Sequence, residues 1–476
     1  MSLRRLWTQV GNLGGVPGGS GAVAGGAPIL PGMLDSAKAR SLAQEALRVS
    51  RADETEVFVE LLEQELNRFT ADHPVQNQVR RLARIAVRVR VDGHEGKAST
   101  GTVTADAVRR TVERAIDVAK RTPKMPADTL PMAGPQTYRL RGRAHVAPDP
   151  RATADSVASM TAACRAEGCT AAGIQGAENE LRLVMNSRGL EVCDLDTRAE
   201  ISLTAFKDDG AGWSSDIAAT REAIDEHTIA QQAVSKALST RDARPVDPGS
   251  YTVILEPAAV ASLLLFAAHK GFGAQQVEDG SSFLAGHLGE RVLGPNVTIA
   301  DDVFDPRTVG HTFDGEGVPR VSVRLIEEGV AKGLVHDRST ARRCGCATTG
   351  HATPQPSSSG PMATNLVLSP GAGASSDLLR DVDRGILVTQ LHYTNMVEPT
   401  KLTLTGMTRN GTFLVERGEV TRPIRNMRFT QSLVEALNRV SGLGGDARLA
   451  SARFGGFTVV PSLRIDGFRF SSGTDF

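Results

Sequence analysis

Two cysteines separated by one glycine, Cys344 and Cys346, form a close pair of soft donor atoms, and His351 follows them in the chain. Thiolate sulfur and imidazole nitrogen are ligands that zinc prefers in proteins. The spacing therefore allows a small structural zinc site in this segment. The alternative, which we favour, is that this segment binds no metal.

A second group of residues has the side chains that a hydrolase or amidase without zinc would need. The set is His269, Glu278 and Ser281. No His or Asp stands next to Ser281 in sequence to activate it as a nucleophile, so any partner must come from elsewhere in the fold. His269 also suits a plain structural role, because a histidine is favourable near the C-terminus of a helix. Asp314 and Glu316 form a possible carboxylate pair, although the glycines around them favour a turn.

The elements that must position these residues centre on one apolar stretch. Tyr251–Leu255 is β-branched and apolar, which predicts a short buried strand. Pro257 suits the first position of a helix, where its missing N–H costs nothing. Ala258–Lys270 has almost no polar residue, so the helix should be buried on nearly all sides and end at Gly271.

Composition excludes several classes of protein. The chain has 476 residues, with 54 lysines and arginines against 54 aspartates and glutamates. This balance argues against a general nucleic-acid binder or a polybasic membrane-surface protein. No apolar run is long enough to cross a bilayer, so no membrane association is expected. Five cysteines are few and odd in number, which favours a reducing, cytoplasmic setting.

The length predicts more than one domain. Composition and turn residues divide the chain into a disordered Gly-rich tail over 1–34, an N-terminal α+β domain over 35–122, a central α+β domain over 123–244, and a strand-rich C-terminal domain over 245–476. The predicted fold class is therefore α+β, with mixed or antiparallel sheets and packed helices.

Local patterns predict individual elements. Asp35 should cap a helix over Ser36–Val49. Alternation of apolar and polar residues predicts strands over Glu56–Glu63 and Arg84–Val91. Asn410-Gly411 is typical of a turn, and Thr430–Val440 is predicted to be the last helix.

Several segments in order carry a resemblance to a known family. These are SSFLAGHLGERV, FDGEGVP, LIEEGVAKGLVHDRSTAR, TTGHA, TNLVLSPG and GTFLVERGEV, all following the strand and buried helix described above. Together they resemble the TldD/PmbA family of cytoplasmic zinc metallopeptidases, also described as modulators of DNA gyrase. The resemblance implies α+β domains and a peptide-binding cavity enclosed by two subunits. In that family TldD subunits carry zinc, and their PmbA (TldE) partners do not.

The resemblance also implies where zinc would bind. The TldD motif is H-E-x-x-x-H on the buried helix, completed by a cysteine near the C-terminus, and here Leu265, Phe266 and Lys270 stand in place of the His, Glu and His. No cysteine follows Cys346. Because zinc needs three protein ligands, we expect no metal and no cofactor in this chain. The segment holding Cys344 and Cys346 matches a family region without a metal role.

Without a zinc site, the remaining function that the resemblance implies is peptide binding. The family holds an extended peptide along an exposed strand, and Met362, Ala363, Thr364 and Asn365 are the matching substrate-binding positions. The expected function is that of a TldE/PmbA-type subunit of a heteromeric metallopeptidase, with zinc in its TldD-type partner and short, unfolded or modified peptides, including natural-product intermediates, as substrates. The alternatives are a self-sufficient hydrolase without zinc, and a non-catalytic regulator or scaffold that binds a gyrase-type partner.

Overall fold

The structure is a computed structural model that describes residues 34–71, 73–355, 357, 359–451 and 456–474. The predicted Gly-rich tail lies outside these residues except for Leu34. The described chain is α+β, as predicted, and contains three sheets with helices packed against them. No helix in these ranges is long and apolar enough to cross a bilayer.

The first sheet has six long antiparallel strands in the order β3-β2-β1-β4-β5-β6. Its strands are β1 (Glu54–Thr70), β2 (His73–Val91), β3 (His94–Thr100), β4 (Thr170–Asn186), β5 (Glu191–Lys207) and β6 (Gly210–Ala218). Because β1 pairs directly with β4, the sheet continues across the domain boundary that the sequence suggests at residue 122.

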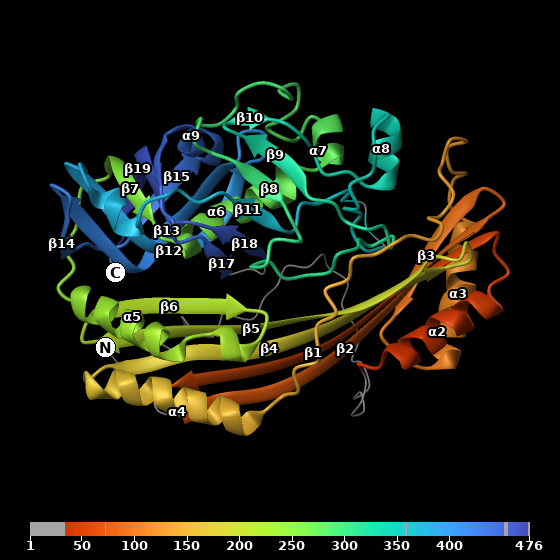
Figure 1. The fold of residues 1–476 in the computed structure, drawn as a ribbon, viewed down its shortest axis with the longest axis horizontal. Helices are drawn as coiled ribbons and strands as arrows, with labels where there is room; N and C mark the ends of the chain where they lie inside the picture. The colour runs from red at the N-terminus through yellow and green to blue at the C-terminus, as the bar shows by residue number, and fades with distance from the viewer. Residues whose placement is uncertain (1–33, 72, 356, 358, 452–455, 475–476) are drawn as a thin grey trace.

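Four helices cover this sheet in two pairs, one toward each end of the strands (Figure 1). They are α2 (Ser36–Val49), α3 (Ala105–Ala119), α4 (Pro150–Ala166) and α5 (Glu226–Ser239). The predicted cap of α2 is confirmed, since the Asp35 carboxylate accepts a hydrogen bond from the N–H of Ala37. Each pair covers an apolar core of its own.

The same sheet is buried on its other face by the C-terminal part of the chain. Val57 and Val59 of β1 pack with the α2 and α3 side chains. Phe58 between them points the opposite way because side chains alternate along a strand, and it packs with Phe313 and Val318. Figure 1 shows the C-terminal body lying along that face of the sheet.

The C-terminal body contains two sheets. One has the order β10-β9-β8-β11-β18-β17; in the other, β12-β7-β19-β15-β13 closes into a ring because β12 also pairs with β13. The strands are β7 (Gly249–Leu255), β8 (Ile299–Asp301), β9 (Val323–Glu327), β10 (Val330–Ala331), β11 (Leu366–Leu368), β12 (Arg384–Glu398), β13 (Thr403–Glu416), β14 (Glu419–Pro423), β15 (Met427–Ser432), β16 (Val440–Leu443), β17 (Arg448–Ser451), β18 (Phe457–Val460) and β19 (Leu463–Gly473).

The helices of this body are α6 (Pro257–Lys270), α7 (Ala274–Glu278), α8 (Arg338–Cys344) and α9 (Leu433–Asn438). Helix α6 contacts β7 and β12 of one sheet and β17 and β18 of the other. Eleven of its fourteen residues are buried, and Pro257 occupies its first turn, so both predictions for this helix are confirmed.

One predicted element is wrong, and another is shorter than predicted. Asn410 and Gly411 have positive φ, but they lie inside β13, where the register against β12 shifts, and so form a bulge instead of a turn. The predicted helix over Thr430–Val440 begins only at Leu433, because the preceding residues belong to β15 and pair with β13. In both places the pairing partner, which is distant in sequence, decides the structure.

Gly96 provides a test of the packing of α3 on β3. A Cβ at this position would lie 2.0 Å from the Ala115 carbonyl oxygen and 2.4 Å from the Ala119 nitrogen. We expect Gly96→Ala to lower the free energy of unfolding by about 1–3 kcal/mol, as overpacking does. Gly134→Ala is the matched control, since no atom lies within 4 Å of the added carbon. Equal thermal midpoints for the two variants would contradict this packing.

Candidate functional site

The positions that the sequence sets against the family zinc motif lie along the C-terminal half of α6. Leu265 is buried, Phe266 is half-buried, and Lys270 is exposed. A Cβ at Gly456 would lie 2.4 Å from Leu265 Cδ1, so this leucine packs closely against Gly456. A methyl group and a phenyl ring offer no lone pair, and an ammonium group repels a cation. These residues do not fit a zinc ion.

The alternative hydrolase residues have separate partners. The His269 Nδ1 lies 2.8 Å from the Leu265 carbonyl oxygen, which is the expected arrangement for a histidine at a helix end. Glu278 pairs with Arg343 at 2.6 Å, and Ser281 donates to the Gln276 carbonyl oxygen at 3.3 Å. No hydrogen bond joins His269, Glu278 and Ser281 in the described chain, so the structure gives this set no catalytic geometry.

The predicted peptide-binding positions lie just before β11. Ala363 is buried, and the N–H groups of Thr364 and Asn365 donate to the Asp301 carboxylate at 2.7 and 2.9 Å. Strand β11 itself lies between β8 and β18, so both of its edges are already paired. Met362 is half-buried, and its N–H donates to the His351 carbonyl oxygen. A role for these four residues in binding peptide stays a prediction.

Asp301 belongs to a buried polar pair that the sequence did not reveal. His351 Nε2 lies 2.9 Å from Asp301 Oδ1, and both side chains are fully enclosed. Burial raises the pKa of Asp301, but His351, Arg320 and the backbone N–H groups outweigh it and lower the pKa to about 2. Burial lowers the pKa of His351.

This pairing has two consequences. The first is that the enclosed side chains of Asp301 and His351 have no access to solvent or substrate in this structure. Their role is structural: Asp301 accepts hydrogen bonds from the loop before β11 and contacts His351, so the pair ties this loop to the loop after α8. His351 is also removed from the cysteines with which the sequence grouped it. The imidazole that lies beside Cys344 and Cys346 is that of His336.

A polar cavity of about 320 Å³ lies between the first sheet and the C-terminal body. Residues of both bodies line it: Arg88, Arg90, Glu95, Lys97, Met125, Pro126, Thr129, Leu130, Glu316, Asp337, Arg338, Ser339, Ala352, Thr353, Gln355, Ser357 and Gly360. No residue of α6 is among them. The walls carry charges of both signs, so the cavity suits the polar groups of a ligand better than an apolar side chain.

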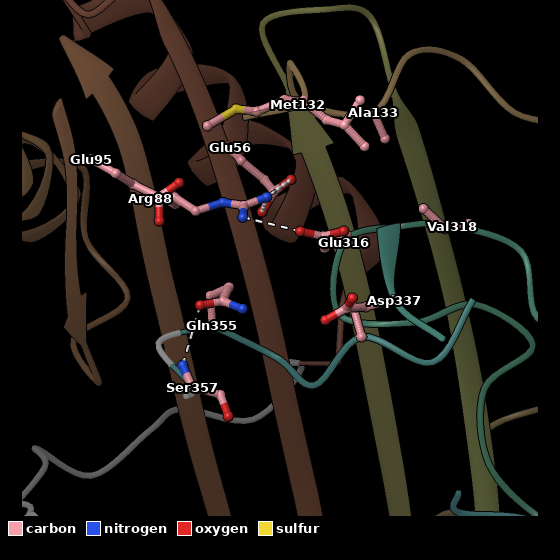
Figure 2. A network of polar contacts seen from close by, with 12 residues as sticks. Glu56, Arg88, Glu95, Met132, Ala133, Glu316, Val318, Asp337, Gln355 and Ser357 are labelled. Atoms are coloured by element: carbon pink, nitrogen blue, oxygen red, sulfur yellow. Dashed lines mark hydrogen bonds and ion pairs between the residues drawn. The ribbon is translucent and has the colours of Figure 1, made fainter. Parts of the chain in front are cut away.

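The wall of this cavity contains a buried arginine between two carboxylates (Figure 2). Arg88 of β2 lies 2.8 Å from Glu56 of β1 and 3.0 Å from Glu316 of the C-terminal body. Burial raises the pKa of Glu56; Arg88 opposes this effect and Glu316 adds to it. The arrangement joins the two bodies by one shared cation, and removal of that cation would leave two buried acids unpaired.

Asp314 lies two residues before Glu316, and the charge of Glu316 acts on its carboxylate. Its carboxylate accepts hydrogen bonds from the N–H groups of Glu316, Val318 and Ala352. Burial and the charge of Glu316 nevertheless raise its pKa to about 7. The Asp314–Glu316 segment is therefore a hydrogen-bonded turn, the structural interpretation that its glycines favour, and it anchors one carboxylate of the network.

Taken together, these observations define a multi-domain α+β protein of three sheets, in which the buried helix α6 lies between the two C-terminal sheets. The sequence profile of the PmbA/TldA metallopeptidase C-terminal domain matches residues 248–472, and that of the central domain matches residues 146–241. The chain belongs to the PmbA/TldD family.

Relatives and solved structures agree with this assignment. A "Metalloprotease TldD homolog" of Haemophilus influenzae is 29% identical over 225 residues, 46% of each chain. A "Metalloprotease PmbA homolog" of the same organism is 23% identical over 401 residues, 80% of this chain and 85% of the relative. The match to TldD therefore spans about half of that relative's length. TldE from Thermococcus kodakarensis superposes with a TM-score of 0.79 at 22% identity, covering 91% of this chain and all of that one.

Arg88 provides a test of the network. Arg88→Met should lower the free energy of unfolding by about 3–5 kcal/mol near neutral pH, because Glu56 and Glu316 lose their shared partner. The loss should shrink as pH falls, since an acid with a raised folded-state pKa destabilises only when it is ionised. Thermal midpoints between pH 4.5 and pH 8, about the range in which such acids titrate, would measure this.

Arg338→Ala is the control for that series. It removes a cavity arginine that has no ion pair within the described ranges. We expect a change within about 0.5 kcal/mol, independent of pH. A loss in Arg88→Met that is small, or that does not depend on pH, would mean that the carboxylates do not rely on Arg88.

Proposed function

We propose that this chain is a TldE/PmbA-type subunit of a heteromeric metallopeptidase, whose zinc is bound by a TldD-type catalytic partner. The proposal is supported mainly by three side chains of α6 that are unsuited to zinc. Leu265, Phe266 and Lys270 stand where the resemblance sets the His, Glu and His of the H-E-x-x-x-H motif. Leu265 is buried and packs against Gly456, and its side chain has no atom that could bind a metal ion. The match to a PmbA homolog over most of both chains supports the same assignment.

The end of α6 is the surface through which the chain would contribute to such an assembly. Phe266, His269 and Lys270 are the residues of this helix that are not buried. An aromatic ring and a cation beside the partner's site can contact peptide or partner without chemistry of their own. An obligate interface of this kind buries about 2,000 Å² or more.

The proposed substrates are short, unfolded or modified peptides, including peptide intermediates of natural products. Extended peptides are recognised mainly through backbone hydrogen bonds, which tolerate many sequences. The balance of 54 basic and 54 acidic residues supports peptide handling over direct nucleic-acid binding. All five cysteines are free thiols, which supports a cytoplasmic location.

Reconstitution with the partner tests the proposal. The purified chain and a purified TldD-type subunit should each be inactive on unfolded peptides, and the mixture should hydrolyse them. A chelator should abolish the activity of the mixture. Substitution of the zinc ligands in the partner should do the same, because the proposal assigns the reacting metal to that subunit.

His269→Ala supplies the control within this chain. Its imidazole already contacts the Leu265 carbonyl oxygen, so its loss should leave most of the turnover and the assembly intact. Two results would contradict the proposal. One is peptide hydrolysis by the isolated chain, and the other is loss of turnover in His269→Ala while the complex still forms.

A further inference from the structure

Three metal-binding side chains gather at the two ends of α8. One donor atom from each of His336, Cys344 and Cys346 lies within 4.8 Å of the other two. The Cys346 sulfur is 3.8 Å from both nitrogens of the His336 ring. In a tetrahedral zinc site the bonds are about 2.0 Å to nitrogen and about 2.3 Å to sulfur, which places neighbouring donors roughly 3.5–3.8 Å apart. The donor atoms here are up to 4.8 Å apart, so the thiols would move closer to the imidazole when a metal ion binds.

The backbone holds the two cysteines in place. Helix α8 begins at a capping box in which Asp337 and Thr340 exchange hydrogen bonds, and it ends at Gly345 in the left-handed conformation, with φ 70°. The N–H of Cys346 then donates to the Ala341 carbonyl oxygen at 3.0 Å. Because Gly345 reverses the chain there, the side chains on either side of it lie on the same side of the helix end.

A second set of hydrogen bonds brings His336 to the cysteines. Thr349 Oγ1 accepts from the His336 N–H at 2.7 Å, and the Thr349 N–H donates to the His336 carbonyl oxygen at 3.2 Å. The segment after Cys346 is thus clamped to the residue that precedes α8. His336 is buried, whereas both cysteines are exposed, so a metal ion would approach from solvent and meet an oriented imidazole.

We propose that His336, Cys344 and Cys346 bind one zinc ion, with the fourth position open to water or to a ligand from another molecule. Binding would release the proton of each thiol, because thiolate is the form that coordinates zinc. None of the three ligands belongs to α6, and the proposal does not depend on the proposed function. It differs from the expectation from sequence that the chain binds no metal.

The position of the site suggests what it would do. Asp337 and Arg338, which follow His336 directly, line the cavity between the two bodies. A metal that links His336 to Cys344 and Cys346 would fix the start of α8 to its end and so fix this cavity wall. The free position would face solvent, where both cysteines are exposed.

Metal titration of the full-length chain tests the proposal. The protein would be reduced, stripped with a chelator, desalted, and titrated with Zn²⁺ against a chromophoric competitor. We expect one zinc per chain. Replacement of zinc by Co²⁺ should give a thiolate-to-cobalt charge-transfer band, which reports sulfur ligands directly. Cys344→Ser, Cys346→Ser and His336→Ala should each weaken binding by at least about tenfold, since even the loss of an outer partner costs that much.

Matched controls are available in the same chain. Cys193→Ser removes a thiol elsewhere, and His287→Ala removes an exposed imidazole that pairs with Glu290. Both should bind zinc like the parent chain. The proposal is overturned if the reduced chain takes up no zinc, if the cobalt form lacks the thiolate band, or if Cys344→Ser and Cys346→Ser bind as tightly as the controls. A Cys344–Cys346 disulfide that persists under reduction would overturn it as well.

Discussion

Burial of both faces of the six-stranded sheet is the constraint on which the rest of this structure depends. Its helices cover one face, and the C-terminal body covers the other through Phe58, Phe313 and Val318. Arg88 points toward the same face as Phe58, so its charge is enclosed when the two bodies meet. Glu56 from the sheet and Glu316 from the C-terminal body compensate the buried charge of Arg88. Arg88 and Glu316 also line the polar cavity between the two bodies.

The chemistry available to α6 follows from its packing. A helix held between two sheets can present side chains only where the sheets end, and here these are Phe266, His269 and Lys270. The rest of the helix is buried and apolar, and Leu265 belongs to this buried part. Any contact that α6 makes with another molecule must therefore involve its exposed C-terminal end.

Local sequence predicted those features that local physics decides. Asp35 and Pro257 mark helix starts through their own backbone chemistry, and the apolar run of α6 predicts its burial. The strands over Glu56–Glu63 and Arg84–Val91 were predicted only in part. Their extensions toward Thr70 and His73 are mostly polar, and they are strands because they pair with each other and, for β1, with β4.

At the candidate sites, too, the sequence does not reveal which distant residues come together. The sequence grouped Cys344 and Cys346 with His351 as possible metal donors and favoured a segment without metal; His351 pairs instead with Asp301. His336 reaches the cysteines through the clamp at Thr349, a contact that no spacing rule reveals. Likewise, nothing near Arg88 in the sequence indicates Glu316 as its partner.

The central claim is that α6 shapes a site whose reacting metal belongs to another subunit. It is tested most directly by anomalous diffraction at the zinc edge from crystals of this chain in complex with its TldD-type partner. The account predicts a zinc peak within the partner's H-E-x-x-x-H motif, close to the exposed end of α6, and no peak at Leu265, Phe266 and Lys270. A zinc ion bound by α6 of this chain, or a complex in which α6 faces away from the partner's metal, would contradict it.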